Sequence, residues 1–344
     1  MIKEIGSEFW ASPQKRCDKH FFLSGRTALE YIIRDIIAQG VAKSALLPSY
    51  CCHTMIEPFV RHGFSLRFYD VFYSKEQGRL CAELPSYQEN EVLFYMSYFG
   101  FSPIMGLDFK KLKERYQIVI DDRTHSWLRT APFQAQADYS FTSFRKWCAL
   151  SGVAEACKYK GRFSNEAGEK TNERYISMRD TAFGEKVDYM SRGGDKTAFL
   201  QRFGEAESLL EEDYEGYRPS CRAMDTLFSA DWEAIRRRRR ENARLLLDGL
   251  AGIKGIAVPF LQLDDGDVPL FVPVLVENGR DALRRYLVEH EVYCPVHWPK
   301  SQLHTPLSER ASRIYDEELS LLCDQRYGRE EMEHIVSLIA NYYR

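Results

Sequence analysis

The chain has 344 residues, 44% of them hydrophobic and 28% charged, which is an ordinary composition for a globular protein with one large and one smaller domain. A net charge of −3 gives no general attraction to nucleic acid. No stretch of about 18 consecutive apolar residues occurs, so the sequence predicts no membrane-spanning helix and no membrane partner.

The nine cysteines argue against a zinc site. Cys51 and Cys52 are adjacent, the other seven are scattered, and no C-x-x-C pair is present, so we expect no metal. The first 17 residues contain no apolar core of signal-peptide length. An odd number of thiols without an export signal favours a cytoplasmic protein.

Residues 20–160 alternate short apolar runs with helical patterns. Apolar residues recur at helical spacing in 27–40, and Gly40 stands where a C-terminal cap belongs. Pro58 lies in a second helical stretch, which it must kink unless it lies near the first turn. The expected helices are 27–40, 51–63 and 107–116, and the expected strands are 44–50, 65–71, 91–100, 117–122, 138–144 and 154–160.

This alternation predicts an α/β fold with a largely parallel sheet, because parallel strands need crossover connections of ten or more residues. The continuous apolar runs "VLFYM" and "IVI" are typical of strands covered on both faces. In such sheets ligands bind beyond the carboxyl ends of the strands. The loops after residues 48, 100, 122 and 144 should therefore face one crevice.

The remaining sequence divides into a polar helical excursion, 161–231, which we expect to be solvent-exposed, and a second α+β unit, 232–344. We expect an N-terminal arm at 1–19, a large domain at 20–231 and a small domain at 232–344. In the small domain we expect helices at 232–250, 280–290 and 329–342 and strands at 255–259, 269–276 and 292–298. Five consecutive arginines, 236–240, are interpreted as the solvated face of a helix, with nucleotide or RNA binding as a remote alternative.

Lys146 follows an apolar strand, "ADYSFTSFRKW", and is either a solvated strand end or a nucleophile held out of water. Asp121 and Asp122 end another apolar strand, "QIVIDD". Acids in this position are commonly turn residues, but a buried carboxylate needs a partner. A lysine and a carboxylate on neighbouring strand ends suit an enzyme that uses pyridoxal 5'-phosphate (PLP). In such an enzyme the amine forms a Schiff base and the carboxylate keeps a proton on the pyridine nitrogen.

A phosphate group needs backbone N–H groups at a helix start and one or two hydroxyls. Gly25, Arg26 and Thr27 open a predicted helix in "SGRTALEYI", and Ser143 adds a hydroxyl three residues before Lys146. Each feature is weak alone, but their order along the chain and their common sheet edge strengthen the set.

These residues resemble the DegT/DnrJ/StrS sugar aminotransferases over nearly the whole chain. "FLSGRTALEYI" is similar to their S-x-G-T-A-A-L turn, "VIDDRTHS" to V-I-E-D-A-A-Q-A, and "DYSFTSFRKW" to D-I-G-T-F-S-F-H-x-x-K, two residues shorter. "MSYFGF", "VHWP" and "LSLLCDQRYGREEMEHIV" match further family segments. The resemblance implies the PLP-dependent transferase fold type I. Its large domain has three layers around a mixed, mostly parallel sheet, and its small C-terminal domain is α+β.

Carried over by position, the resemblance makes Lys146 the residue that binds the cofactor and shuttles the proton. Asp122 would pair with the pyridinium nitrogen, and His125 would lie beside the ring's phenolic oxygen. Ser143, Gly25 and the Arg26–Thr27 backbone would hold the phosphate.

The departures concern the ring and the substrate. Cys52 stands where the family has an aromatic residue that stacks on the ring, so His125, Tyr50 or another residue must stack instead. The glycine-rich run after the lysine is reduced, and "GYRPSCRAMD" matches only loosely the N-Y-R segment that reaches into a partner subunit. His297 is either a structural histidine or a substrate contact, and Tyr98 is expected in the pocket wall.

The resemblance implies a PLP-dependent aminotransferase, a homodimer, that moves an amino group from glutamate to a nucleotide-linked keto sugar. Other PLP chemistry, a dehydratase, decarboxylase or lyase, stays open, although family dehydratases replace the lysine that is retained here as Lys146. A catalytically silent binding or regulatory protein is a third alternative, favoured by the missing aromatic residue and opposed by the intact set of Asp122, Ser143 and Lys146.

Overall fold

The computed structural model describes residues 17–344 except 41–42, 103, 131–136 and 305. The expected N-terminal arm, 1–19, therefore lies outside the described residues up to residue 16. None of the described helices is long and apolar enough to cross a membrane.

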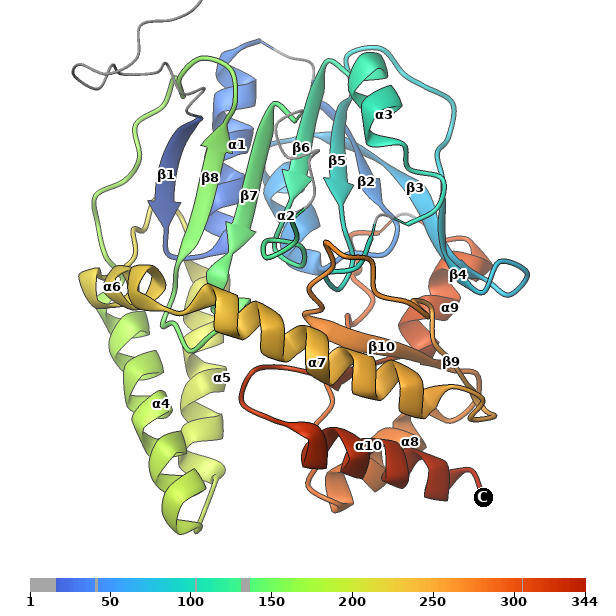
Figure 1. Cartoon of the computed structure of the whole chain (residues 1–344). Helices are drawn as coiled ribbons and strands as arrows, with labels where there is room; N and C mark the ends of the chain where they lie inside the picture. Colours follow the sequence, from blue (N-terminus) through green and yellow to red (C-terminus); the bar gives the residue numbers. More distant parts are fainter. Residues whose placement is uncertain (1–16, 41–42, 103, 131–136, 305) are drawn as a thin grey trace, which may run out of the picture.

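One mixed sheet of eight strands, in the order β1-β8-β7-β6-β5-β2-β3-β4, forms the centre of the large domain (Figure 1). The strands are β1 (Asp18–Phe22), β2 (Ser44–Pro48), β3 (Ser65–Ser74), β4 (Arg79–Glu83), β5 (Val92–Met96), β6 (Ile118–Asp122), β7 (Tyr139–Ser143) and β8 (Ala154–Lys158). The pairs β3–β2, β2–β5, β5–β6 and β6–β7 are parallel, and β1–β8, β7–β8 and β3–β4 are antiparallel. The α/β fold with a mixed, mostly parallel sheet is confirmed.

The central strands are covered on both faces, as their continuous apolar runs predict. Every residue of β5, β6, β7 and β8 is buried. The helices of this part are α1 (Gly25–Ala38), which packs against β7 and β8, α2 (His53–Arg61) and α3 (Phe109–Arg115). The strands β2, β5, β6 and β7 run in the same direction. Their last residues therefore lie at the same edge of the sheet, and these are Pro48, Met96, Asp122 and Ser143.

The polar excursion is helical, as expected. Helices α4 (Glu173–Arg192) and α5 (Thr197–Glu212) form a hairpin that projects from the sheet edge where β7 ends, and α6 (Cys221–Ser229) follows them (Figure 1). The expectation of a purely solvent-exposed excursion is wrong, because Tyr175 of α4 and Leu210 of α5 pack in a cluster with Leu23 of the large domain. The hairpin is therefore anchored beside the β7 edge.

The small domain contains a three-stranded antiparallel sheet in the order β11-β10-β9. Its elements are α7 (Trp232–Leu250), β9 (Ile256–Ala257), β10 (Phe271–Val276), α8 (Arg280–Glu289), α9 (Glu309–Glu317), β11 (Glu318–Leu322) and α10 (Arg329–Tyr342). The strand expected at 292–298 is wrong. This segment lies beside β11 (Glu318–Leu322), where the Pro295 carbonyl accepts a hydrogen bond from Ser320 N (3.0 Å), but Pro295 has no N–H with which to continue a ladder.

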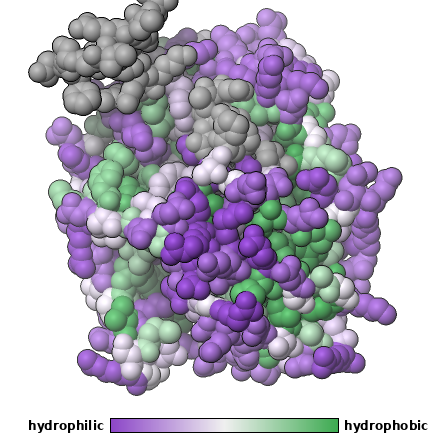
Figure 2. Space-filling model, viewed as in Figure 1, coloured by the Kyte–Doolittle hydropathy of each residue, from purple (hydrophilic) through white to green (hydrophobic). Residues whose placement is uncertain are grey.

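The five arginines of α7 are not a uniformly solvated face, so that interpretation is wrong in part. Hydrophilic side chains gather over the middle of the face that carries α7 (Figure 2). Arg239, however, is only 2% exposed; its guanidinium lies 4.9 Å from the Trp147 ring centre, and its Nε donates to Gln325 Oε1 (2.9 Å). Arg236 donates to the Leu128 carbonyl (3.1 Å). Through these contacts Arg239 and Arg236 hold α7 of the small domain against Trp147 and Leu128 of the large domain.

We expect Arg239→Met to lower the free energy of unfolding by about 2–4 kcal/mol, because it leaves buried acceptors without their donor. Those acceptors include the Leu270 carbonyl, 3.0 Å from Arg239 Nη1. Urea unfolding measures the change, and Arg237→Met, at an exposed position of the same run, is the matched control with an expected effect within about 0.5 kcal/mol. Equal effects of the two substitutions would contradict the structural role of Arg239.

Candidate active site

Asp122, the last residue of β6, is fully buried, and only one of its two carboxylate oxygens has a hydrogen-bond partner. Its Oδ1 accepts a hydrogen bond from Thr124 N (2.8 Å), whereas its Oδ2 is buried without a partner. Burial raises the pKa of Asp122 to about 6, although Thr124 and the Lys146 ammonium both lower it. A buried carboxylate oxygen with no donor is a costly arrangement that a bound N–H group would relieve.

The two neighbouring aspartates have different surroundings, because successive residues of a strand point to opposite faces. Burial raises the pKa of Asp121 to about 7, and the charged groups that act on it are Arg123, Asp122 and Arg129. Lys146 acts on Asp122 instead. Asp122 is therefore the carboxylate on the side of the lysine.

Lys146 lies directly beyond β7, in a single 3-10 turn, Phe144–Lys146. Its side chain is solvent-exposed, yet protein groups surround it closely enough that burial lowers the pKa of its amine, and the Arg145 guanidinium lowers it further. The next residue, Trp147, is buried and fixed at both ends. Its Nε1 donates to the Thr124 carbonyl (2.9 Å), and its own carbonyl accepts from Gln325 Nε2 (2.8 Å). The lysine is thus held beside Asp122 by both domains.

The first turn of α1 meets the end of β7. Ser24 caps the helix by accepting from Thr27 N (3.1 Å), and the Thr27 hydroxyl donates to the Tyr214 carbonyl (2.6 Å). A Cβ on Gly25 would lie 3.2 Å from the Cβ of Ser143, so the glycine lets the helix start approach that serine. Within the described chain, the N–H groups of Gly25 and Arg26 and the Ser143 hydroxyl make no hydrogen bond. These groups suit an anion, whereas the Thr27 hydroxyl already has a partner.

His125 and His297 come from different domains and meet edge to face, with ring centres 5.7 Å apart. His125 Nδ1 accepts from Phe99 N (3.3 Å), and its ring stacks on Trp298 (5.5 Å, 28°). His297 Nδ1 is bonded to Ser320 Oγ (2.8 Å). Burial, His297 and the Lys146 charge lower the pKa of His125 well below its usual value. Burial and the Lys146 charge together lower the pKa of His297 to about 3. Both imidazoles are therefore neutral at physiological pH.

Tyr98 and Tyr50 lie behind this group. Tyr98 is fully buried, and its hydroxyl donates to the Tyr50 carbonyl (2.6 Å). The Tyr50 hydroxyl in turn donates to the carbonyl of His297, so neither hydroxyl is available to a ligand. Cys52, half-buried at the N-cap of α2, accepts a hydrogen bond at its sulfur from the Thr54 hydroxyl (3.2 Å), and it acts electrostatically on Lys146.

Sequence reasoning missed four residues around the lysine. Trp298 stacks on His125, and Arg145, Arg179 and Glu207 form an ion-pair cluster whose charges act on Lys146. The sequence does show that a cationic residue, Arg145, directly precedes the lysine. Nothing local in the sequence connects it to Glu207, 62 residues away.

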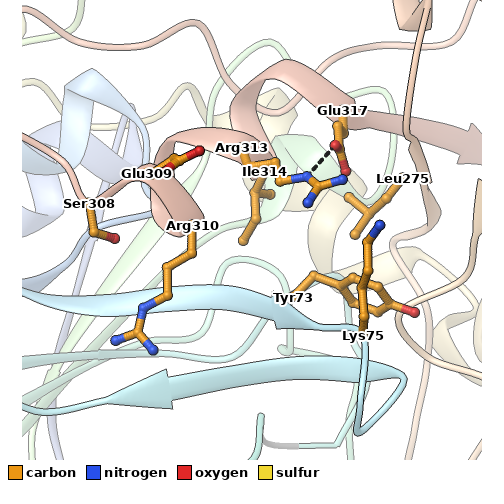
Figure 3. A pocket seen from close by; sticks show the side chains of 9 residues that line it. All are labelled: Tyr73, Lys75, Leu275, Ser308, Glu309, Arg310, Arg313, Ile314 and Glu317. Carbon is orange, nitrogen blue, oxygen red and sulfur yellow. Dashed lines mark hydrogen bonds and ion pairs between the residues drawn. The ribbon is translucent and has the colours of Figure 1, made fainter.

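A pocket of about 430 Å³ lies elsewhere, between β3 and α9, and none of the predicted site residues lines it (Figure 3). Its three cations are already paired. Arg310 bonds Asp70 (2.9 Å), Arg313 bonds Glu317 (2.5 Å), and Lys75 bonds Glu277. This pocket has no free cation for an anionic ligand. Within the described ranges, no group of three or more His, Cys, Asp or Glu could hold a metal ion.

The residues around Lys146 fit PLP by their own chemistry. The orphaned Asp122 oxygen is an acceptor for a pyridinium N–H, and the α1 amides with Ser143 are donors for a phosphate. The exposed Lys146 follows Ser143 by three residues at the end of β7, the strand next to β6, which ends in Asp122. The structure thus brings together Gly25, Arg26, Ser143, Lys146, Asp122, His125, His297 and Cys52, and it places Thr27 and Tyr98 in supporting positions.

The fold is that of the sugar aminotransferases. The chain is similar to CalS13 from Micromonospora echinospora (14% identity, TM-score 0.62, covering 94% of this chain and 87% of that one). It is also similar to Spr1654 from Streptococcus pneumoniae in its PLP form (14% identity, TM-score 0.64, covering 95% of this chain and 88% of that one). A DegT/DnrJ/EryC1/StrS aminotransferase from Brucella abortus is similar as well (16% identity, TM-score 0.59, covering 94% of this chain and 86% of that one). At these identities the likeness establishes the fold, and it confirms at that level the resemblance seen in the sequence. No family model matches the chain, and no curated protein matches its sequence significantly.

Proposed function

We propose that the protein is a PLP-dependent aminotransferase that transfers an amino group from an amino acid such as glutamate to a keto sugar. The observation that carries this proposal is the unpartnered, buried Oδ2 of Asp122 on the side of Lys146. When bound, PLP supplies an aldehyde that reacts with amines and a ring that accepts electrons.

Each residue has a role that follows from its surroundings. Asp122 holds the pyridinium proton, and the lowered pKa of Lys146 favours the neutral amine that can bond to the cofactor and move a proton at the substrate carbon. The N–H groups of Gly25 and Arg26 and the Ser143 hydroxyl bind the phosphate. His125 and His297, both neutral, offer Nε2 atoms to ligand oxygen atoms without adding charge.

The sugar acceptor is supported by the similar solved structures. CalS13 is a sugar aminotransferase, which supports a sugar as acceptor. The nucleotide attached to the sugar and the homodimer are proposed from the resemblance of the sequence to the family, and the cytoplasmic location from the cysteine content and the lack of a signal-peptide pattern. Tyr98, in this proposal, supports the loop that carries the site, because its hydroxyl is committed to Tyr50.

The test is amino-group transfer itself. We expect the purified protein with PLP to convert ¹⁵N-glutamate and a nucleotide-linked 4-keto sugar into 2-oxoglutarate and a ¹⁵N-labelled amino sugar, detected by mass spectrometry. Omission of the keto sugar is the control and should limit 2-oxoglutarate to one equivalent per site. Absence of label in every member of a panel of keto sugars and keto acids would contradict the proposal.

A further inference from the structure

Near Lys146, two arginines, Arg145 and Arg179, share the carboxylate of Glu207. Arg145 Nη2 donates to Glu207 Oε2 (3.0 Å), and Arg145 Nη1 pairs with Glu207 Oε1. Arg179 Nη1 donates to that same Oε1 (3.1 Å). All three charges act on Lys146, so the cluster borders the reacting amine.

The cluster has more positive than negative charge. Two guanidinium groups face one carboxylate, whose pKa the guanidinium of Arg145 helps to lower to about 2 against the effect of burial. Asp180, the other acid that acts on Arg179, is paired with Arg222 (3.7 Å). The two arginines therefore share one carboxylate, and within the described part of the chain the pair carries one more positive charge than its ionic partner.

This excess charge lies in a mostly enclosed position. The side chains of Arg145 and Arg179 are only 18% and 13% exposed. The Arg179 guanidinium lies 5.2 Å from the Phe183 ring centre and 4.8 Å from that of Phe203, and its Nε is buried without a partner. Enclosed charge without a counter-charge destabilises a protein, so its presence beside the lysine requires a reason.

We propose that Arg145 and Arg179, oriented by Glu207, form a subsite for an anionic oxygen group of the ligands that react at Lys146, namely the carboxylate of the amino donor. This inference rests on the proposed function. Arginine binds carboxylates through two parallel N–H donors, and the aromatic rings of Phe183 and Phe203 hold the Arg179 fork in place. The cofactor phosphate has its own donors at Gly25, Arg26 and Ser143, which leaves the arginines for the donor.

The test compares Arg179→Gln with the wild type in two titrations. In the first, PLP is added to cofactor-free protein and binding is followed by protein fluorescence. In the second, glutamate is added to the PLP-loaded protein and the cofactor absorbance is followed, with no acceptor present. We expect the glutamate concentration at half-change to rise about 10- to 100-fold, as for loss of a charge-assisted contact, and PLP affinity to stay within about twofold.

Two further variants support the interpretation. Arg202→Gln removes the same charge from the same hairpin, where Arg202 pairs with Glu185 (3.0 Å), and should change neither titration. Arg179→Lys keeps the positive charge but loses the paired N–H donors of the guanidinium, so it should give an intermediate glutamate response. It replaces Arg179→Gln in both titrations if that variant does not fold.

Two outcomes would overturn the assignment. Weaker PLP binding with an unchanged glutamate response would assign the arginines to the cofactor phosphate instead. A lower melting temperature with both titrations unchanged would make the cluster purely structural. If glutamate fails to change the wild-type spectrum, the proposed function fails. The subsite is then tested separately by calorimetric binding of succinate to the PLP-loaded wild type and Arg179→Gln, where equal affinities would contradict it.

Discussion

Asp122→Asn is expected to lower the rate of amino transfer by about 10²- to 10³-fold while the protein remains folded. Removing one preorganised electrostatic partner of a reacting group typically has an effect of this size. An amide at this position cannot hold a proton on the pyridine nitrogen, so the cofactor ring would accept electrons less readily. Single-turnover rates with glutamate, followed by cofactor absorbance, measure the change.

The same substitution should stabilise the cofactor-free protein at neutral pH. Folding raises the pKa of Asp122 from its ordinary 3.8 to about 6, so the carboxyl favours the folded state below about pH 4, and that advantage is lost as the pH rises through 6. Two pKa units correspond to about 3 kcal/mol, and an unpaired buried amide removes about 1–2 kcal/mol of the gain. Asp122→Asn should therefore gain about 1–2 kcal/mol above pH 6 and lose about 1–2 kcal/mol below pH 4, where the wild-type carboxyl is protonated in both states and only the cost of the amide remains.

Asp121→Asn is the matched control for both effects. Its carboxyl is equally buried, with a pKa raised to about 7, but it lacks the interaction with Lys146. It should increase stability at neutral pH and keep most of the activity. Loss of activity in Asp121→Asn alone would mean that the wrong aspartate has been assigned to the cofactor.

Lys146→Ala should abolish covalent attachment of the cofactor and lower amino transfer by about 10⁴-fold or more, because the side chain is both nucleophile and proton carrier. Borohydride reduction followed by peptide mass spectrometry measures attachment. In the wild type we expect the pyridoxyl group on the peptide that contains Lys146.

Lys158→Ala is the comparison for this experiment, because Lys158 is buried and paired with Asp35 (2.7 Å) away from the strand ends that carry the site. If it folds, it should keep the attachment at Lys146. Modification of any lysine other than Lys146 in the wild type would contradict the assignment.

The sequence predicted the part of the site that depends on strand order. Asp122 and Lys146 each follow an apolar strand, and neighbouring parallel strands must end at the same edge, so their proximity follows from the pattern of residues 117–146. The helices α7 and α10 have the predicted bounds, because their apolar spacing is regular over several turns.

The errors concern interactions between distant segments. The burial of Arg239 depends on Trp147 and Gln325, which no local pattern connects to an arginine run. The apolar segment 292–298 has the composition of a strand, but it lies beside β11 and Pro295 has no N–H to donate to a ladder. Glu207 joins Arg145 only because the α4–α5 hairpin folds back beside β7.

The absorption spectrum of the purified protein with PLP, before and after addition of excess glutamate, tests the central claim most directly. We predict a yellow band from the cofactor bound at Lys146, which glutamate converts to the band of the amine form, and no such band in Lys146→Ala. A wild-type protein that shows no bound-cofactor band after incubation with PLP would contradict the account, because the fold would then serve a function without this cofactor.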